Sequence, residues 1–139
     1  MKKKIEFYKF LAKNRKLNIV IEGHSMDPVL KTGDTIYIVE DNIDCIGGVV
    51  AFLFNDEIVA HRLLKIENDV FYCKGDHSAS LESVLKSQVI GSVRMFQRRN
   101  TLHELAGISE NEALRLYRIC TAIKRNRSAL KEVQNDAVR

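Results

Sequence analysis

The spacing of apolar residues divides the chain into a helical start, a β-rich middle and a helical end. Near the N-terminus, Ile5, Tyr8 and Leu11 or Ala12 share one helical face and predict a short amphipathic helix over residues 3–13. From Leu17 to Phe96 the pattern changes to short runs rich in Val, Ile, Phe and Tyr, which favour strands. The predicted strands are Asn18–Glu22, Thr35–Val39, Gly48–Phe54, Glu57–Ile66, Val70–Lys74 and Val89–Phe96.

Turn-forming residues separate these strands. Asn55-Asp56 and Asn68-Asp69 each link two apolar runs and predict two tight hairpins. The middle of the chain is therefore expected to be a compact, mostly antiparallel β domain. With helices at both ends, the predicted fold class is mostly β (α+β).

The C-terminal part has the sequence pattern of helices. Thr101 with Glu104, and Ser109 with Glu112, each fit a capping box at a helix start. After Ser109, one stripe of helical period is formed by Ala113, Leu116, Tyr117, Cys120 and Ile123. These patterns divide the chain into three regions: a basic amphipathic helix over 1–16, a β domain over 17–97, and a basic helical extension over 98–139.

The composition of the 139-residue chain, with 45% hydrophobic and 29% charged residues, is that of an ordinary globular domain. Apolar runs reach only about eight residues, whereas a membrane span needs about 20, so neither a span nor a signal peptide is expected. Three cysteines at unrelated spacings suit free thiols in a reducing compartment, which favours the cytoplasm. The four histidines share no ligand spacing, so we expect no metal, and we predict no cofactor.

Charge is segregated along the sequence. Residues 1–18 carry a net charge of +6, residues 19–93 carry −7, and residues 94–139 carry +5. Basic ends can contact the anionic surface of a membrane, or they can be the solvated faces of terminal helices. A peripheral membrane contact therefore stays open as a prediction, and no nucleic-acid partner is expected.

The loop Gly23–Pro28 carries the candidate chemistry. Ser25 directly follows an apolar strand, in a loop with a glycine and the chain's single proline, where a scaffold can present a nucleophile. A serine hydroxyl needs a base to take its proton. His61, inside the predicted strand Glu57–Ile66, can supply that base because an imidazole titrates near neutral pH.

The order of short motifs resembles type I signal peptidases and the superfamily that they share with LexA-type self-cleaving repressors. Gly-x-Ser-Met-x-Pro at 23–28 is followed by Gly-x-Val-Ala-Phe at 48–52, Ala-His-Arg at 60–62, and Lys-Gly-Asp at 74–76. The resemblance covers about residues 17–94. A histidine in place of a lysine as base is similar to the endoplasmic-reticulum-type branch, which uses Ser, His and Asp.

The resemblance implies a role for each matching residue. Ser25 is the nucleophile, His61 the general base, and the Ser25 backbone N–H helps to hold the oxyanion. Asp76 is the favoured third member, with Glu82 as the alternative. Met26 and Pro28, in the same loop as Ser25, are expected to contact substrate.

Three functions remain in view. The first is a soluble serine endopeptidase that removes a peptide, leader or signal segment through an acyl-enzyme. The second is an inactive peptide-binding or accessory protein of the same fold, favoured by Gly47-Gly48 where relatives carry Gly-Asp and by the expected lack of an anchor. A self-cleaving repressor is the weakest, because the 24 residues before Ser25 are too few for a DNA-binding domain.

Overall fold

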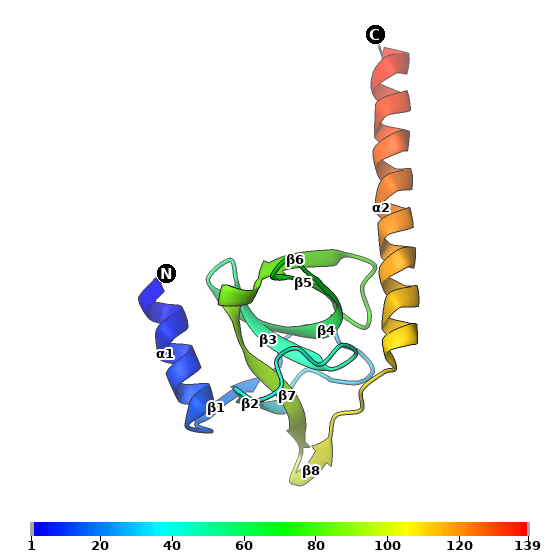
Figure 1. Cartoon of the computed structure of the whole chain (residues 1–139). Coiled ribbons are helices and arrows are strands. Elements are labelled where there is room, and N and C mark those ends of the chain that lie inside the picture. Colours follow the sequence, from blue (N-terminus) through cyan, green and yellow to red (C-terminus); the bar gives the residue numbers. More distant parts are fainter. Residues whose placement is uncertain (1, 139) are drawn as a thin grey trace.

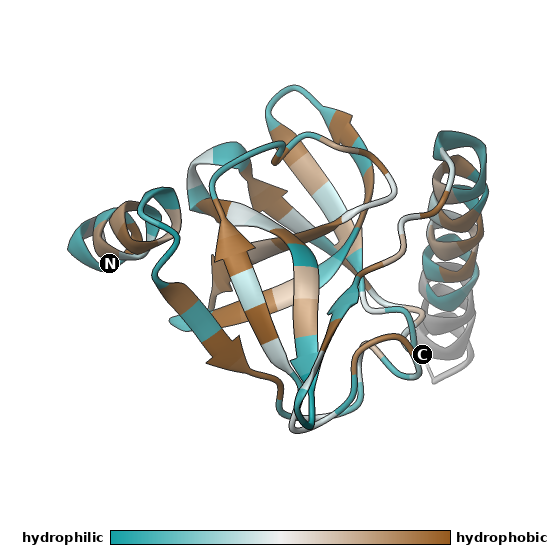
Figure 2. Cartoon of the chain, turned by 90° about the horizontal axis from the view of Figure 1, so that it is seen from below, coloured by the Kyte–Doolittle hydropathy of each residue, from teal (hydrophilic) through white to brown (hydrophobic). Residues whose placement is uncertain are grey.

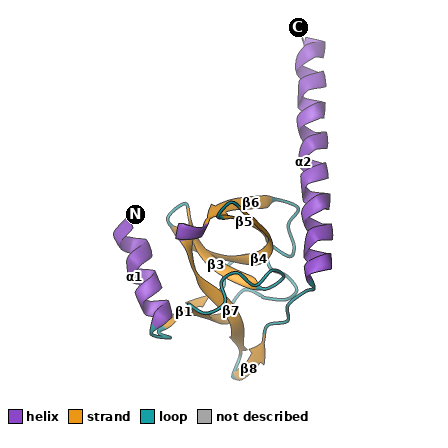
Figure 3. Ribbon diagram, in the orientation of Figure 1, coloured by secondary structure: helices purple, strands orange, loops and turns teal. Residues whose placement is uncertain are grey.

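A curled antiparallel sheet forms the body of the protein, with one helix on each side of it (Figure 1). The computed structural model describes the backbone of residues 2–138 and the side chains of residues 3–127. Helices α1 (Lys2–Lys13) and α2 (Glu110–Val138) flank the strands, and α2 extends well beyond the sheet. The expected mostly β (α+β) fold class is confirmed (Figure 3).

Eight strands build the sheet, all in antiparallel pairs, in the order β1-β2-β7-β3-β4-β5-β6, with β8 paired to β7. Their bounds are β1 Leu17–Val20, β2 Thr35–Val39, β3 Val49–Phe54, β4 Glu57–Glu67, β5 Val70–Lys74, β6 Leu81–Leu85, β7 Val89–Arg98 and β8 Thr101–Glu104; a short 3₁₀ helix, η1, spans Lys86–Gln88. The six predicted strands are all present within a few residues. Strands β6 and β8 were not predicted.

The two predicted hairpins form as expected. Asn55 and Asp56 have φ angles of 50° and 66°, and Asn68 and Asp69 have 52° and 61°. Two left-handed residues in succession give the turn whose twist matches that of the flanking strands, and Asn and Asp tolerate this conformation best after glycine. These turns fix the registers of β3 with β4 and of β4 with β5.

The predicted helix start at Thr101 is wrong. Residues 101–104 form β8, which pairs with the end of β7 through the register Arg98↔Thr101. Arg99, at φ 58°, turns the chain between the two strands. Hydrogen bonds to β7 outweigh the local capping pattern, so the β body extends to Glu104 rather than to residue 97. Helix α2 instead begins after Ser109, whose Oγ accepts a hydrogen bond from the Glu112 N–H at 3.1 Å.

Two apolar clusters hold the sheet and helices together. One lies under α1 and joins β1, β2, β3 and β7, with Leu30, Ile36 and Ala51 fully buried. The other lies between β3, β4, β5 and β6, with Phe52 and Phe71 at its centre. The expected stripe of α2 packs on β4, where Ala113 is fully buried and Tyr117 lies edge-on to Tyr72.

Candidate active site

The loop after β1 holds Ser25 at the surface on a buried anchor. Ser25 is exposed, whereas the next residue, Met26, is 2% exposed, and Leu30 is fully buried. The Ser25 carbonyl accepts a hydrogen bond from the His77 N–H at 2.9 Å. A Cβ on Gly75 would lie 2.5 Å from the Ser25 carbonyl oxygen, so a glycine lets the 75–77 loop approach this closely. The backbone of Ser25 is thus held by the buried residues that follow it and by the 75–77 loop.

His61 lies within hydrogen-bond reach of Ser25, as predicted. Its Nε2 is 3.0 Å from the Ser25 Oγ. The residue comes from β4, is 7% exposed, and packs edge-on against the Phe52 ring at 6.0 Å between centroids. Packing by a buried aromatic holds the imidazole in one orientation, which a proton shuttle requires.

Glu82, on β6, contacts the other nitrogen of the imidazole. Its Oε1 lies 3.0 Å from His61 Nδ1, but the carboxylate lies off the N–H direction, so the contact is an ion-pair approach rather than an aligned hydrogen bond. The second oxygen, Oε2, is buried and has no hydrogen-bond partner among the described residues.

Cys73 is the residue opposite Glu82 in the β5–β6 register and is fully buried. Burial, with a smaller contribution from the Glu82 charge, raises the pKa of the Cys73 thiol. The thiol is therefore neutral near pH 7 and adds no second negative charge beside the Glu82 carboxylate.

Asp76, the favoured third member in the sequence analysis, does not contact His61. Its carboxylate is bound by the Arg62 guanidinium, with Nε to Oδ1 at 3.1 Å and Nη2 to Oδ2 at 2.7 Å. The planar guanidinium presents two parallel donors to the two carboxylate oxygens, and this arrangement occupies Asp76 fully. That assignment is corrected: the alternative, Glu82, is the acid beside His61.

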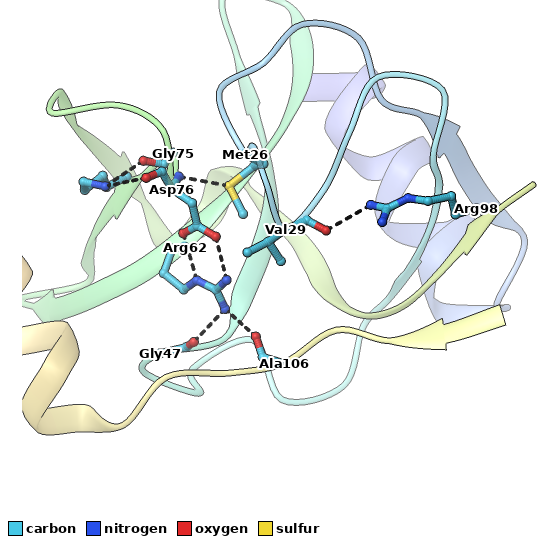
Figure 4. A network of polar contacts seen from close by, with 9 residues as sticks. Met26, Val29, Gly47, Arg62, Gly75, Asp76, Arg98 and Ala106 are labelled. Carbon is cyan, nitrogen blue, oxygen red and sulfur yellow. Dashed lines mark hydrogen bonds and ion pairs between the residues drawn. The ribbon is translucent and has the colours of Figure 1, made fainter. Parts of the chain in front are cut away.

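Arg62 ties three segments together behind the site (Figure 4). Besides Asp76, its Nη1 donates to the carbonyls of Gly47 at 3.1 Å and Ala106 at 2.8 Å. Asp76 in turn connects to the nucleophile loop, because its N–H donates to the Met26 Sδ at 3.4 Å. Gly47 has φ 92°, and a Cβ there would collide with the Ile108 carbonyl oxygen, so this position requires glycine.

A groove runs from the Ser25–His61 pair between β1 and β4. It has a volume of about 470 Å³. One wall comes from the β1 side and the other from the start of β4, and its lining residues are Ile19, Val20, Ile21, Glu22, Ser25, Met26, Glu57, Ile58, Val59, Ala60 and His61. The surface of the groove is about equally polar and apolar, with one carboxylate, Glu22 or Glu57, on each wall.

Both walls of the groove are strand edges with free backbone groups. Ile21 exchanges hydrogen bonds with Gly33 and Asp34, so by the alternation of an antiparallel pair the N–H and C=O of Val20 and Glu22 face the groove. On β4, the backbone N–H and C=O of Leu63 bond toward β3. By the same alternation, the backbone N–H and C=O of Ile58 and Ala60 point away from β3. Strand β5 pairs with β4 only from Arg62 onward. Both edges thus present backbone groups with which a further strand could pair.

The two residues expected to bind substrate have different positions. Met26 lines the groove through a side chain that is itself mostly buried. Pro28 is exposed and is not among the lining residues, so its predicted role is not supported. The reason is the turn after Ser25, where the Leu30 N–H donates to the Met26 carbonyl at 3.0 Å and takes Pro28 off the groove.

The oxyanion donor expected from the sequence is free to act. Within the described part of the chain, the Ser25 N–H has no backbone acceptor. Gly23, two residues earlier, has no side-chain donor to add, and its carbonyl accepts a hydrogen bond from Thr32 Oγ1 at 2.6 Å. The Ser25 N–H is therefore the donor that this loop offers to a developing oxyanion.

Sequence reasoning missed the strand that carries Glu82, although a signal was present. In Leu81–Leu85, Val84 packs into the second apolar cluster. Because side chains alternate along a strand, Glu82 shares that inward face. The serines Ser78 and Ser80 before the strand and the two polar residues within it hide this alternation in the sequence. The pairing with β5 is what makes the segment a strand.

Within residues 3–127, no three His, Cys, Asp or Glu side chains are close enough to hold a metal ion. Over their described residues, neither α1 nor α2 combines the length and apolar character of a membrane-crossing helix. No protein-family model matches the chain, and the search of curated proteins found no match either. The functional reading therefore rests on the residues and their geometry.

Proposed function

We propose that the protein is a serine endopeptidase of the signal-peptidase type, with Ser25 as nucleophile, His61 as general base and Glu82 as the acid that orients His61. The observation that supports it is the series of contacts from Ser25 Oγ to His61 Nε2 and from His61 Nδ1 to Glu82 Oε1, each 3.0 Å long. A hydroxyl, an imidazole and a carboxylate in this order are the parts that acyl transfer uses.

The chemistry follows from these positions. His61 Nε2 takes the Ser25 proton as Oγ attacks the scissile carbonyl carbon, and the carbonyl oxygen becomes an oxyanion beside the Ser25 N–H. The imidazolium then gives that proton to the leaving amine as the C–N bond breaks. Water attacks the resulting ester, its proton passes to His61 and on to the Ser25 oxygen, and the acid product leaves.

The groove favours an extended peptide as substrate. Free backbone groups at Val20 and Glu22 on one edge and at Ile58 and Ala60 on the other would hydrogen-bond a strand inserted between them. Such pairing holds any sequence in register and leaves selectivity to the side chains that line the groove. A peptide, leader or signal segment fits this description.

The test is labelling with a fluorophosphonate probe, followed by peptide mapping. The probe should modify Ser25, and Ser25→Ala and His61→Ala should each abolish labelling. The control is His24→Ala, since His24 is exposed and pairs with Asp27 at 3.0 Å rather than with Ser25, so this variant should be labelled like the wild type. Labelling that is absent from the wild type, or that survives in Ser25→Ala, contradicts the proposal.

A peptide-binding protein without catalysis is the second candidate. The observation that favours it is the lack of a side-chain oxyanion donor at Gly23, together with the unaligned contact between Glu82 and His61. It predicts that extended peptides bind to the groove while the probe fails to label Ser25. Peptide binding measured on Ser25→Ala and on the wild type, beside labelling, separates the two functions.

A further inference from the structure

The outward face of α1 carries two exposed phenylalanines. Phe7 is 58% exposed and Phe10 is 61% exposed, although the helix already packs on the sheet through its opposite face. Ile5, Tyr8 and Ala12 make those inward contacts. The two phenylalanines therefore contribute little to folding, and each leaves a large apolar surface in water.

The apolar surface continues from α1 onto the end of β6. Phe10 and Leu85 line the same groove, which has a volume of about 710 Å³, and Leu85 is 56% exposed. Figure 2 shows α1 at one side of the sheet, with hydrophobic and hydrophilic residues alternating along it. Phe7, Phe10 and Leu85 are together called the α1 surface below.

Lysines surround the α1 surface. Lys3 is exposed one helical turn before Phe7, and Lys9, Lys13 and Lys86 line the groove with Phe10 and Leu85. Glu6, Glu40 and Asp69 also line that groove and balance the charge of its three lysines, whereas Lys3 lies outside it. Residues 1–18 as a whole nevertheless carry a net charge of +6. Two of the α1 lysines already have partners: Lys4 pairs with Asp56 at 3.2 Å, and Lys9 donates to the Ser87 carbonyl at 2.9 Å.

We propose that the α1 surface inserts into the interface of an anionic lipid bilayer. A short helix with phenylalanines toward the membrane and lysines around them lies in the plane of the interface, where rings enter the acyl boundary and ammonium groups meet lipid phosphates. The anionic bilayer is the occupant that matches both features. This proposal does not rest on peptidase activity.

The structure decides which residues can take part. The sequence analysis left open a contact between the basic ends and an anionic membrane. Tyr8 packs inward, so Phe7 and Phe10 are the rings of α1 that face outward. Lys4 is held by Asp56 and Lys9 donates to the Ser87 carbonyl at 2.9 Å, so Lys3, Lys13 and Lys86 are the lysines of this surface that remain for lipid phosphates.

Co-sedimentation with vesicles tests the proposal. The full chain should bind vesicles of phosphatidylcholine with phosphatidylglycerol, bind neutral phosphatidylcholine vesicles much less, and lose binding as salt rises. The double variant Phe7→Ser/Phe10→Ser should weaken binding at least tenfold, and Lys3→Gln/Lys13→Gln should weaken it only toward anionic vesicles. Leu102→Ser is the matched control, because Leu102 on β8 is 58% exposed and lies outside the α1 surface.

Three results would overturn the proposal, two of them from co-sedimentation. One is no binding to anionic vesicles at low salt, and the other is equal binding by Phe7→Ser/Phe10→Ser and by Leu102→Ser. A concentration-dependent dimer that dissociates only in the phenylalanine variant would assign the surface to a second copy and reject the bilayer. Thermal unfolding of each variant shows that it is folded, which the exposure of the replaced side chains leads us to expect.

Discussion

Glu82, and not Asp76, is the carboxylate that lies against the His61 imidazole, with Oε1 3.0 Å from Nδ1. The two acids belong to neighbouring segments and differ in their partners. Asp76 neutralises a buried guanidinium, whereas Glu82 has one oxygen on the imidazole and the other without a partner among the described residues. The contacts therefore give Asp76 a structural role in the scaffold, and they support the proposed role of Glu82 in orienting His61. Each role has its own experimental signature.

Replacing Glu82 by glutamine should strongly slow acylation of Ser25 with little effect on folding. The amide keeps the shape but loses the charge that stabilises the imidazolium, and in a comparable triad that loss is about ten-thousandfold. The measurement is the rate of fluorophosphonate labelling. Glu67→Gln is the control, since Glu67 pairs with Lys65 away from the site. Equal labelling rates in the two variants would leave a Ser25–His61 dyad.

Asp76→Asn should instead destabilise the whole fold. It leaves the Arg62 charge, whose side chain is 3% exposed, without its carboxylate, and breaking a buried pair in this way typically costs about 3–5 kcal/mol. Urea unfolding gives the loss directly. Arg62→Lys keeps the charge but not the two parallel donors, so its loss should be smaller. If Asp76→Asn is as stable as the wild type, the folded protein does not need the Asp76 charge to keep Arg62 buried.

Gly75→Ala should displace Ser25. The added Cβ would lie 2.5 Å from the Ser25 carbonyl oxygen and 3.1 Å from the Ser25 Cβ, so either the 75–77 loop or the nucleophile loop must shift. Labelling of Ser25 should fall at least tenfold, because misplacement near 1 Å costs about a hundredfold in well-ordered sites. Gly107→Ala is the matched control, since its nearest neighbour lies 3.5 Å away. Unchanged labelling in Gly75→Ala would mean that the two loops move independently.

Stability should depend on the ionisation of Asp34 at acidic pH. Its side chain is 3% exposed and accepts hydrogen bonds from Arg98, which are the main cause of a pKa below the ordinary 3.8. The hydrogen bond from the Lys31 N–H lowers the pKa further. A lowered folded-state pKa stabilises the protein above pH 3.8, and this stabilisation disappears as the pH falls through the folded-state value.

The matching experiment compares the wild type with Asp34→Asn. The difference in their free energies of unfolding should be largest near neutral pH and should shrink below pH 3.8. Urea titrations from pH 7 downward measure it. Asp56→Asn, which alters an exposed pair with Lys4, should show little difference at any pH. A difference that grows on acidification would contradict the role of the Asp34–Arg98 pair.

Peptides with lysine or arginine near the cleaved bond should be preferred substrates. Glu22 and Glu57 lie on opposite walls of the groove, and within the described chain neither has an ion-pair partner. We expect cleavage of a basic peptide to exceed that of its glutamine counterpart severalfold, and this preference to disappear in Glu22→Gln/Glu57→Gln. Equal cleavage of both peptides would show that the groove does not select charge. Probe labelling of the same variant shows whether Ser25 stays reactive.

Sequence periodicity and turn chemistry were enough to predict most of the fold. Asn55-Asp56 and Asn68-Asp69 identify hairpins because only a few residues tolerate two left-handed positions in succession. The inward face of α1 and the stripe of α2 follow from helical period. Turn chemistry and helical period both depend on residues that are close in sequence, so the sequence alone predicts these turns and helices well.

The sequence also identified Ser25 and His61 as the candidate pair, because motifs in a characteristic order can be recognised without knowing the distances between their residues. The identity of the acid beside His61 was decided by tertiary structure. Asp76 follows a glycine as the motif requires, yet its carboxylate pairs with Arg62 from β4. The Arg62 side chain is only 3% exposed, and a buried guanidinium needs a carboxylate to balance its charge. Glu82 reaches His61 only because β6 pairs with β5 and turns that side chain inward.

The β8 strand illustrates the same limit at the other end of the domain. Thr101 and Glu104 have the spacing of a helix cap, and the sequence alone predicts a helix there. Backbone pairing with β7, a partner fixed by the sheet rather than by neighbours in sequence, makes these residues a strand. Local preference determined which segments are regular, whereas long-range hydrogen bonds and a buried charge determined which side chains meet.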